Sequence, residues 1–259
     1  MFQFSIVIVC KNEDTIIGKT LNILNSFAPD IVVYDNGSTD RTIEIVKTFP
    51  VNLVQGKWEG FGKTKNKANS FAKHDWILSL DADEIPDEEL INALSTLSPP
   101  SEKSVFTIKF KNFLGDTWIR YGEWGFDKHI RLFNRKEVSW NEAEVHEQLI
   151  FPVDVLHEKI KGHVLHYTMR HDNDYKTKIT QYAVLSAEKY FRQGKNSFWW
   201  KQWLSPIFSF TQNYFFKLGF LDGKNGLTCA KMTAQYTFLK YKKLKELLVT
   251  NDQQSAKTS

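Results

Sequence analysis

The 259-residue chain contains only two cysteines, Cys10 and Cys229, which lie far apart and without metal-ligand spacing. This usage favours a reduced, cytoplasmic compartment over a disulfide scaffold. No stretch has the roughly eighteen uninterrupted apolar residues that a membrane-spanning helix needs, so no span is predicted. The chain begins without a basic leader or a cleavage site, from which we expect no signal peptide.

The net charge of +4 is unevenly distributed along the chain. Residues 195–259 carry ten lysines against three acidic residues, a net charge of +7, which leaves −3 for the preceding part. The basic tail has no recognised nucleic-acid motif and the front is negative, so nucleic-acid binding is disfavoured. The sequence therefore places acidic chemistry at the front and basic charge in the tail.

Short apolar segments alternate with helical patterns over the first hundred residues, at 6–10, 30–35, 51–54 and 76–80. This alternation is typical of an α/β fold, with a mostly parallel sheet and helices on both faces. No Gly-x-Gly-x-x-Gly follows the first segment, and the chain has no complete P-loop motif. The dinucleotide-binding and P-loop versions of the fold are therefore poorly supported.

Polar turns follow three of these predicted strands. Two turns span 11–14 and 35–40, and the third holds the carboxylates of Asp81, Asp83 and Glu84. The carboxyl ends of parallel strands form one edge, where such sheets bind ligands. Clustered carboxylates repel one another unless a cation lies between them, and Mg²⁺ or Mn²⁺ bridging phosphate oxygens is the natural partner. A solvated acidic turn without a ligand is the alternative.

Four motifs occupy these turns and the helix between the second and third: Lys11-Asn12-Glu13, Asp35-Asn36-Gly37-Ser38-Thr39-Asp40, Lys63-Thr64-Lys65-Asn66 and Asp81-Ala82-Asp83-Glu84. In this order they resemble the family 2 glycosyltransferases. The resemblance implies a GT-A fold, a nucleoside-diphosphate-sugar donor, a divalent metal and inversion at the anomeric carbon. It also implies a catalytic domain at 1–168, with a nucleotide-sugar half at 1–100 and an acceptor half at 101–168.

The resemblance also assigns roles to single residues of the donor site. Asp35 matches the position that hydrogen-bonds the base, usually uracil, Asp81 the residue nearer the ribose, and Asp83 the direct metal ligand. The other donor contacts are assigned to Glu13, Lys65 and Asn66. A carboxylate can accept the imide N–H of uracil, but Asp35 can instead cap its own turn. Glu84 either supports the metal ligand or belongs to the acidic start of the next helix.

The middle of the chain is β-rich and carries a second set of motifs: Phe113-Leu114-Gly115, Trp118-Ile119-Arg120, Arg131-Leu132-Phe133 and Val145-His146-Glu147. These resemble one bacterial subgroup of the family, the lipopolysaccharide core β-glucosyltransferases. The implied acceptor is a lipopolysaccharide core or another lipid-linked glycan of the cell envelope.

Inverting transfer needs a base that takes the proton of the attacking hydroxyl, and a carboxylate is the usual group. Glu147 is the first choice, because the His–Glu pair belongs to the subgroup motif, and Glu144 is the runner-up. The alternative for Glu147 is an ion pair with Arg131 or Arg135.

Other side chains of the middle region are candidates for metal and acceptor contacts. His146 can complete the metal shell, order the base or contact phosphate, and His166 can do the same from the next strand. A structural role is the alternative for both. Trp124 and Trp118 are candidates for stacking on a sugar ring, and Arg131 for contacting the sugar or the acceptor.

The remaining chain, residues 169–250, is predicted to be helical. Its segments 198–204, 214–217 and 236–248 are aromatic or apolar with lysines interspersed. This composition is typical of helices that lie in a membrane interface near anionic lipid, so we expect a peripheral protein on the inner face of the cell membrane. Packing on the catalytic domain or on a second subunit is the alternative. Residues 251–259 are predicted to be disordered.

The leading interpretation is a metal-dependent inverting glycosyltransferase that uses a UDP-sugar. A sugar-nucleotide nucleotidyltransferase shares a similar sheet, but it requires a Gly-rich basic loop after the first strand, where Lys11-Asn12-Glu13 stands. A non-catalytic nucleotide-binding protein at the membrane is the other alternative, and it requires neither the acidic cluster nor Glu147.

Overall fold

A computed structural model describes residues 2–28, 30–142, 148–169, 172–195, 198 and 200–258. Strands and helices alternate at the start of the chain, as the sequence predicts. These elements are β1 (Ser5–Cys10), α1 (Ile17–Leu24), β2 (Ile31–Asp35), α2 (Thr42–Val46), β3 (Asn52–Gln55), α3 (Phe61–Ser70), β4 (Trp76–Asp81), β5 (Glu84–Pro86) and α4 (Glu88–Ser95).

The middle of the chain is mostly strand. Its elements are β6 (Ser104–Leu114), β7 (Thr117–Trp118), the 3-10 turn η1 (Trp124–Phe126), β8 (Lys128–Asn134), β9 (Ser139–Trp140), β10 (Leu149–Ile150) and β11 (Leu156–Met169). The rest is helical: α5 (Asp172–Arg192), α6 (Lys201–Thr211), the π-helical η2 (Gln212–Phe216), the 3-10 turn η3 (Gly219–Asp222) and α7 (Gly223–Thr258).

The main sheet has the strand order β3-β2-β1-β4-β8-β6-β11-β5, with β7 on β6. The strands β3, β2, β1 and β4 pair in parallel. The strands that follow β4 are antiparallel, for example β8 on β4 and β5 on β11. The parallel part therefore comes from the alternating first hundred residues, and the antiparallel part comes largely from the β-rich middle.

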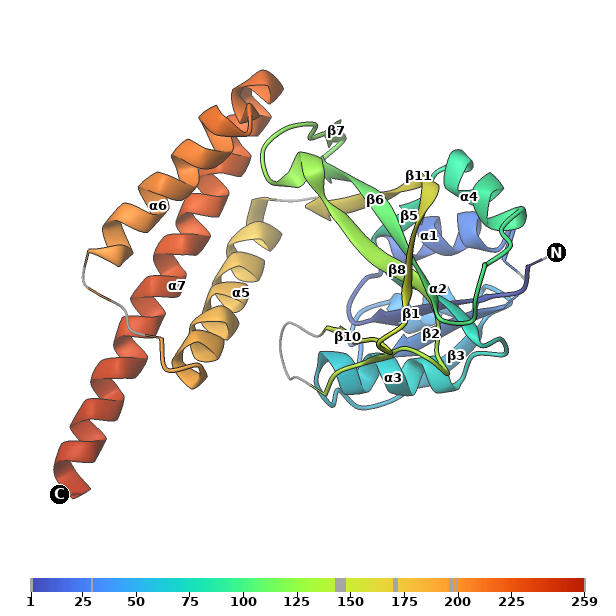
Figure 1. Cartoon of the computed structure of the whole chain (residues 1–259), viewed down its shortest axis with the longest axis horizontal. Helices are drawn as coiled ribbons and strands as arrows, with labels where there is room; N and C mark the ends of the chain where they lie inside the picture. Colours follow the sequence, from blue (N-terminus) through green and yellow to red (C-terminus); the bar gives the residue numbers. More distant parts are fainter. Residues whose placement is uncertain are drawn as a thin grey trace. The chain divides into compact units, whose positions relative to one another are not determined.

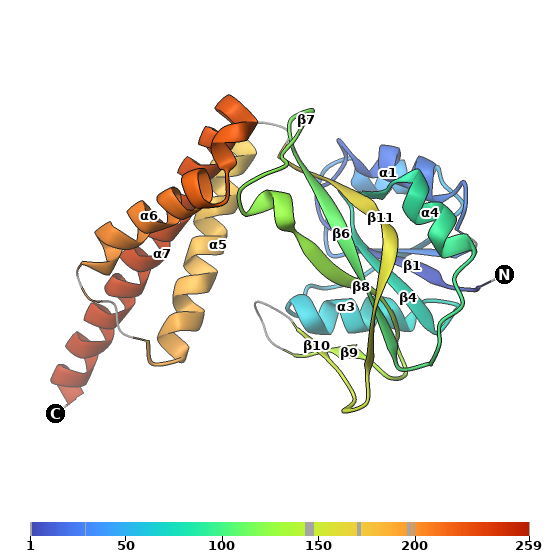
Figure 2. The same cartoon turned by 45° about the horizontal axis from the view of Figure 1, so that its top comes forward.

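The strands β1, β2 and β4 are apolar on both faces because helices cover both. Ile6 and Ile8 of β1 belong to one core cluster with the apolar side chains of α1 and α4. Val7 between them belongs to a second cluster with Ala68 of α3. Figures 1 and 2 show α1 and α4 on one side of the strands and α3 on the other. Alternate residues of a strand point to opposite faces, which explains the continuous apolar runs in the sequence.

The chain divides into two compact units. The sheet unit comprises residues 1–111 and 128–166, and the helical unit comprises residues 112–127 and 167–259. The division after His166 falls two residues before the predicted end of the catalytic domain. The segment 112–127, which the sequence assigns to the acceptor half, instead groups with the helices.

The helical unit is built around α7, against which both α5 and α6 pack. The segment 112–127 is fixed to this unit by polar contacts. The carboxylate of Asp222 accepts hydrogen bonds from the backbone N–H groups of Arg120 and Tyr121, at 3.0 and 2.8 Å. The side chain of Asn213 accepts one from Glu123 N at 2.8 Å. These partners lie 90 residues or more apart in sequence, which is why local patterns do not reveal the grouping.

The last helix, α7, continues to Thr258 through the tail that the sequence predicts to be disordered. No glycine or proline follows Gly226 in the sequence, so no residue that usually ends a helix is present there. The structure is therefore helical at residues 251–258, where the polar composition predicts disorder. Among the described helices, none is both long enough and apolar enough to cross a membrane.

Candidate functional site

The carboxyl ends of β1, β2 and β4 lie side by side at one edge of the sheet. The parallel register pairs Cys10 with Asp35 of β2, and Val9 with Asp81 of β4. The three polar turns that follow these strands therefore start from neighbouring positions, as the sequence predicts.

The first two turns are interlocked by hydrogen bonds. The backbone N–H of Asn12 donates to Ser38 Oγ at 2.9 Å, and Asn12 Oδ1 accepts from Thr39 N at 2.8 Å. The backbone N–H of Glu13 donates to Thr42 Oγ1 at 2.7 Å. Asn12 has a φ of 57°, in the left-handed region that asparagine tolerates better than most residues. The backbone at Glu13 is thus fixed, and a donor contact of its side chain stays a prediction.

Asp35 is 1% exposed, and its carboxylate holds the second turn together. Oδ1 accepts hydrogen bonds from the backbone N–H groups of Gly37 and Ser38, both at 3.0 Å, and Oδ2 accepts from the Ser38 hydroxyl. Gly37 has a φ of 101°, which glycine adopts without strain. These contacts are those of a turn cap, one of the two predicted roles. The contact with a base stays a prediction.

The thiol of Cys10 lies beside Asp35, with Sγ 3.9 Å from Oδ2. Burial raises the pKa of this thiol, and the negative charge of Asp35 raises it further. Cys10 is therefore protonated at neutral pH, and a thiolate nucleophile at this position is disfavoured.

The acidic turn, residues 81–84, follows β4 and is held by a buried arginine from β8. Arg131 is 7% exposed, and its Nη2 lies 3.2 Å from Asp81 Oδ2 and also contacts Glu84 Oε1. Glu84 Oε2 in turn accepts the backbone N–H of Asp81 at 3.0 Å. From α1, the hydroxyl of Thr20 donates to the carbonyl oxygen of Ala82 at 2.6 Å. The carboxylates are thus fixed in position by contacts from two other elements.

The charges around the acidic turn shift the pKa values of its carboxylates in opposite directions. Burial raises the pKa of Asp81, but the charges of Arg131 and Lys65 outweigh it and hold this pKa below the usual range. Burial also raises the pKa of Glu84, and the neighbouring charges of Asp81 and Asp83 raise it further, although Arg131 opposes them. A further cation beside these carboxylates would reduce the repulsion that raises the pKa of Glu84.

His166 from β11 faces the acidic turn. Its Nε2 lies 3.7 Å from Asp83 Oδ2, and its backbone is paired in register with Glu84. The ring of Phe110 lies between three functional groups, 6.0 Å from the ring of His166, 4.9 Å from that of His129 and 5.3 Å from the Arg131 guanidinium. A separation of 3.7 Å is longer than a hydrogen bond. It leaves a carboxylate oxygen and an imidazole nitrogen facing each other at the ligand edge.

The fit of a divalent cation depends on how many ligands the protein must supply. Among the described residues, no three His, Cys, Asp or Glu side chains gather as a metal-binding group. Mg²⁺ in nucleotide sites is commonly held by one or two protein groups together with substrate phosphates. Asp83 with His166 meets this smaller requirement, so the residues present fit a cation that arrives with a diphosphate.

Helix α3 carries the two other predicted donor residues, and both contact Trp140 of β9. The ammonium of Lys65 lies 4.5 Å from the centroid of the Trp140 ring. The side chain of Asn66 donates to the Trp140 carbonyl at 2.7 Å and accepts its backbone N–H at 2.9 Å. The amide of Asn66 therefore fixes β9 on α3, and its donor contact stays a prediction.

The predicted base lies in the stretch that β9 leads into. Glu144, Glu147 and His146 fall outside the described residues. On either side of this stretch, Asn141 N donates to the Gln148 carbonyl at 2.8 Å, and Gln148 N donates to Asn141 Oδ1 at 3.1 Å. The two flanks of the stretch are thus tied together beside α3, and the assignment of the base stays a prediction.

The predicted acceptor contacts are divided between the two units. Trp124 and Trp118 belong to the helical unit, where Trp124 packs against a cluster that includes Ile179 and Met232. The Trp118 ring has the Arg120 guanidinium 4.6 Å from its centroid. Arg131 belongs to the sheet unit, and its guanidinium contacts the acidic turn as described above. Sugar or acceptor contacts of these residues stay predictions.

Comparison with known proteins assigns the chain to a family. The chain belongs to glycosyl transferase family 2, whose model matches residues 5–144, more than half of the sequence. The family predicted from the four motifs is confirmed, and the structure has the predicted α/β fold with a helical C-terminal extension.

Relatives match along nearly the whole chain. An uncharacterized glycosyltransferase of Rickettsia typhi is 28% identical over 258 residues, covering 95% of this chain and 88% of the relative. The lipopolysaccharide core biosynthesis glycosyltransferase LpsC of Rhizobium meliloti is 27% identical over 246 residues, covering 91% and 89%. Among solved structures, S. aureus TarS is similar with a TM-score of 0.44 and 18% identity, covering 71% of this chain and 40% of that one.

Proposed function

We propose that this glycosyltransferase is metal-dependent and inverting, and that it moves a sugar from a UDP-sugar to a lipopolysaccharide core or another lipid-linked glycan of the cell envelope. The observation that carries the proposal is the acidic turn, with its three carboxylates gathered between Arg131 and His166 at the ligand edge. The acceptor class is supported by the name of the Rhizobium meliloti relative, a lipopolysaccharide core biosynthesis enzyme.

The donor nucleotide in this proposal lies over the interlocked first and second turns. Asp35 accepts the imide N–H of uracil, and Asp81, whose pKa is lowered, remains ionised and accepts a hydrogen bond from the ribose. Glu13 and Lys65 line the same donor edge. Asn66 has an indirect role and positions β9, because both ends of its side-chain amide are hydrogen-bonded to the backbone of Trp140.

Asp83 and His166 would hold a divalent cation, Mg²⁺ or Mn²⁺, beside the diphosphate of the donor. When bound, the ion neutralises the charge that develops on the departing diphosphate. His146 is the other predicted ligand. Glu84 and Arg131 keep the carboxylates of the acidic turn in position.

Transfer needs one bond to form and one to break at the anomeric carbon. The acceptor oxygen attacks this carbon from the face opposite the diphosphate, while its proton passes to Glu147, with Glu144 as runner-up. The bond between the anomeric carbon and the diphosphate oxygen breaks, and UDP leaves with the electron pair. Attack from the opposite face inverts the configuration. No observation favours the nucleotidyltransferase or the non-catalytic alternative.

The location in this proposal is the inner face of the cell membrane, where the chain is held as a peripheral protein. A lipid-linked acceptor presents its sugars at that surface, and the basic charge of residues 195–259 suits anionic lipid.

A donor panel tests the proposed function. UDP-, GDP-, ADP- and CMP-sugars are each incubated with the full chain, with Mn²⁺ and with a chelator, and release of the nucleotide is measured. We expect release from UDP-sugars only, and only with the ion. Asp83→Asn should abolish release, whereas Asp75→Asn, a surface carboxylate paired with Lys136, should retain it. Full release with the chelator, or from another nucleotide in preference to UDP, would contradict the proposal.

A further inference from the structure

Helix α6 and the turns after it expose an unusual concentration of large apolar side chains. Of the 20 such side chains that the described part of the chain exposes, 11 lie between Phe198 and Leu221. Within α6, Ile207 is 63% and Phe208 66% exposed, and no residue of the helix is buried. A contiguous apolar surface on a water-soluble chain usually marks an interaction site.

The exposed side chains follow one face of the helix. Trp200, Leu204, Ile207 and Phe208 recur at intervals of three to four residues, which places them on one stripe. Phe215 and Phe216 of η2 extend the exposed surface beyond the end of α6. An amphipathic helix normally turns its apolar stripe toward the core. Here the stripe faces outward, and we call it the α6 face.

The positive charge of residues 198–221 indicates which kind of partner binds the α6 face. Residues 198–221 contain Lys201 and Lys217 and no acidic residue. The ammonium of Lys201 lies 5.5 Å from the ring centroid of Phe198 and 5.9 Å from that of Trp200. Aromatic side chains beside lysines are typical of helices in the boundary between lipid head groups and acyl chains. A second copy of this chain would bring two positively charged tails together, whereas an anionic bilayer attracts the tail.

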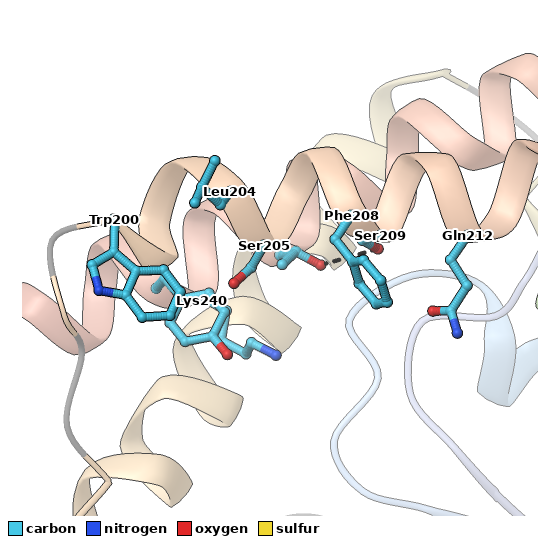
Figure 3. A pocket seen from close by; sticks show the side chains of 9 residues that line it. Trp200, Leu204, Ser205, Phe208, Ser209, Gln212 and Lys240 are labelled. Carbon is cyan, nitrogen blue, oxygen red and sulfur yellow. Dashed lines mark hydrogen bonds between the residues drawn. The ribbon is translucent and has the colours of Figure 1, made fainter.

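A crevice of about 370 Å³ runs along the α6 face between α6 and α7. Its lining includes Trp200 directly before α6, Phe208 of α6, Gln212 of η2 and Lys240 of α7. Figure 3 shows the side chains of Trp200, Phe208 and Gln212 projecting on the side where Lys240 lies. The crevice thus places apolar side chains next to the ammonium group of Lys240.

Lys240 is suited to bind an anion in this crevice. Its ammonium lies 4.8, 5.0 and 5.5 Å from the ring centroids of Tyr190, Tyr241 and Tyr236. In the described residues, no carboxylate pairs with it. Three aromatic faces hold the cation in place and leave its charge available for a phosphate oxygen.

We propose that the α6 face docks on an anionic phospholipid bilayer, with its apolar side chains among the acyl chains and Lys240 on a head-group phosphate. The proposal deepens the membrane location given under the proposed function and rests on it. Its readout is binding, which needs no catalysis, so a failure of docking is distinguishable from a failure of glycosyl transfer.

Vesicle flotation with the full chain tests the proposal. The vesicles contain equal parts of phosphatidylglycerol and phosphatidylcholine, or phosphatidylcholine alone. We expect the wild-type chain to float with the anionic vesicles and to be released by high salt. The double variant Ile207→Ser, Phe208→Ser should bind about one to two orders of magnitude more weakly. The matched control is Phe126→Ser, because Phe126 is 68% exposed in the same unit but lies outside the α6 face.

A second pair of variants tests the head-group contact. Lys240→Gln should weaken binding about fivefold, and Lys242→Gln, which removes the same charge from an exposed position on α7, should weaken it less. Equal losses would overturn the role of Lys240. Unchanged flotation of the double variant, or equal binding to neutral vesicles, would overturn docking on an anionic bilayer. Sedimentation showing a dimer that the double variant dissociates, without vesicle binding, would assign the α6 face to a second copy. Release of UDP is measured for every variant in parallel.

Discussion

Among the described residues, the sheet unit buries four charged side chains, those of Asp35, Asp83, Glu84 and Arg131, whereas the helical unit exposes large apolar side chains along α6 and the turns after it. Arg131 and Glu84 lie inside the sheet unit, where each compensates the other. Phe208 and Ile207 lie on the surface of the helical unit. Both arrangements reverse the usual distribution, and both carry a cost in free energy. Each therefore points to a function, ligand binding in the first unit and docking in the second.

The largest expected effect concerns the base in the sheet unit. Glu147→Gln should keep UDP-sugar binding and lose turnover by about 10²–10⁴-fold, because the amide is nearly isosteric but cannot accept the proton. Glu144→Gln should cost much less. Single-turnover kinetics with each variant checks both statements. The opposite ranking would move the role to Glu144, and two mild effects would place the base elsewhere.

The next prediction compares how much a buried charge of the sheet unit and a surface charge of the helical unit contribute to the free energy of unfolding. Arg131→Met removes the partner of a fully buried carboxylate and should lower the free energy of unfolding by about 3–5 kcal/mol. Lys242→Met, at an exposed position of α7, should change it by less than about 0.5 kcal/mol. Denaturant unfolding of both variants measures the difference. Similar small changes would show that Arg131 contributes no more to stability than a surface lysine.

A smaller effect is expected at Asp35, where the two predicted roles differ in outcome. Asp35→Ala should weaken UDP binding by about 1–3 kcal/mol if the carboxylate accepts the imide of the base. Discrimination between UDP and other nucleoside diphosphates should then fall as well. Calorimetric titration gives both quantities. Unchanged discrimination with lowered thermal stability would leave Asp35 as a turn cap only.

The smallest effect is expected at Asp87, a carboxylate of the sheet unit whose contacts are structural. It caps α4 through Leu90 N at 3.0 Å and also accepts from His163 N at 2.9 Å. Burial raises its pKa, but these donors and Lys111 outweigh it and lower the pKa below the usual value. Asp87→Ala should cost about 1–2 kcal/mol of unfolding free energy.

The sign of the pH dependence follows from the lowered pKa. The carboxylate of Asp87 stabilises the fold fully above its unfolded pKa of about 3.9, and this contribution is lost as the pH falls through the folded pKa. The difference in stability between wild type and variant should therefore be constant from neutral pH to about pH 4 and shrink below it. A difference that stays constant in acid would contradict the assignment.

Local patterns were sufficient to predict the parallel strands and their alternation with helices. The apolar runs of β1, β2 and β4 are buried by helices on both faces. Family motifs placed the acidic turn at the ligand edge. These features depend on residues that are close together in sequence.

The features that the sequence did not predict depend on distant partners. Residues 84–86 form β5 because Val164 and His166 of β11 pair with them, whereas the sequence indicates only a turn. Asn66 bonds to Trp140 across 74 residues, and Arg131 reaches Glu84 across 47. The sequence makes His166 a candidate for the same roles as His146, but nothing local shows that it faces Asp83.

The central claim is that the acidic turn binds a divalent cation together with the donor diphosphate. The most direct test is calorimetric titration of UDP into the wild-type chain and into Asp83→Ala, with and without Mn²⁺. We predict that Mn²⁺ tightens UDP binding to the wild type, and that this gain disappears in Asp83→Ala and is reduced in His166→Gln. Equal UDP affinity of wild type and Asp83→Ala in the presence of Mn²⁺ would contradict the claim.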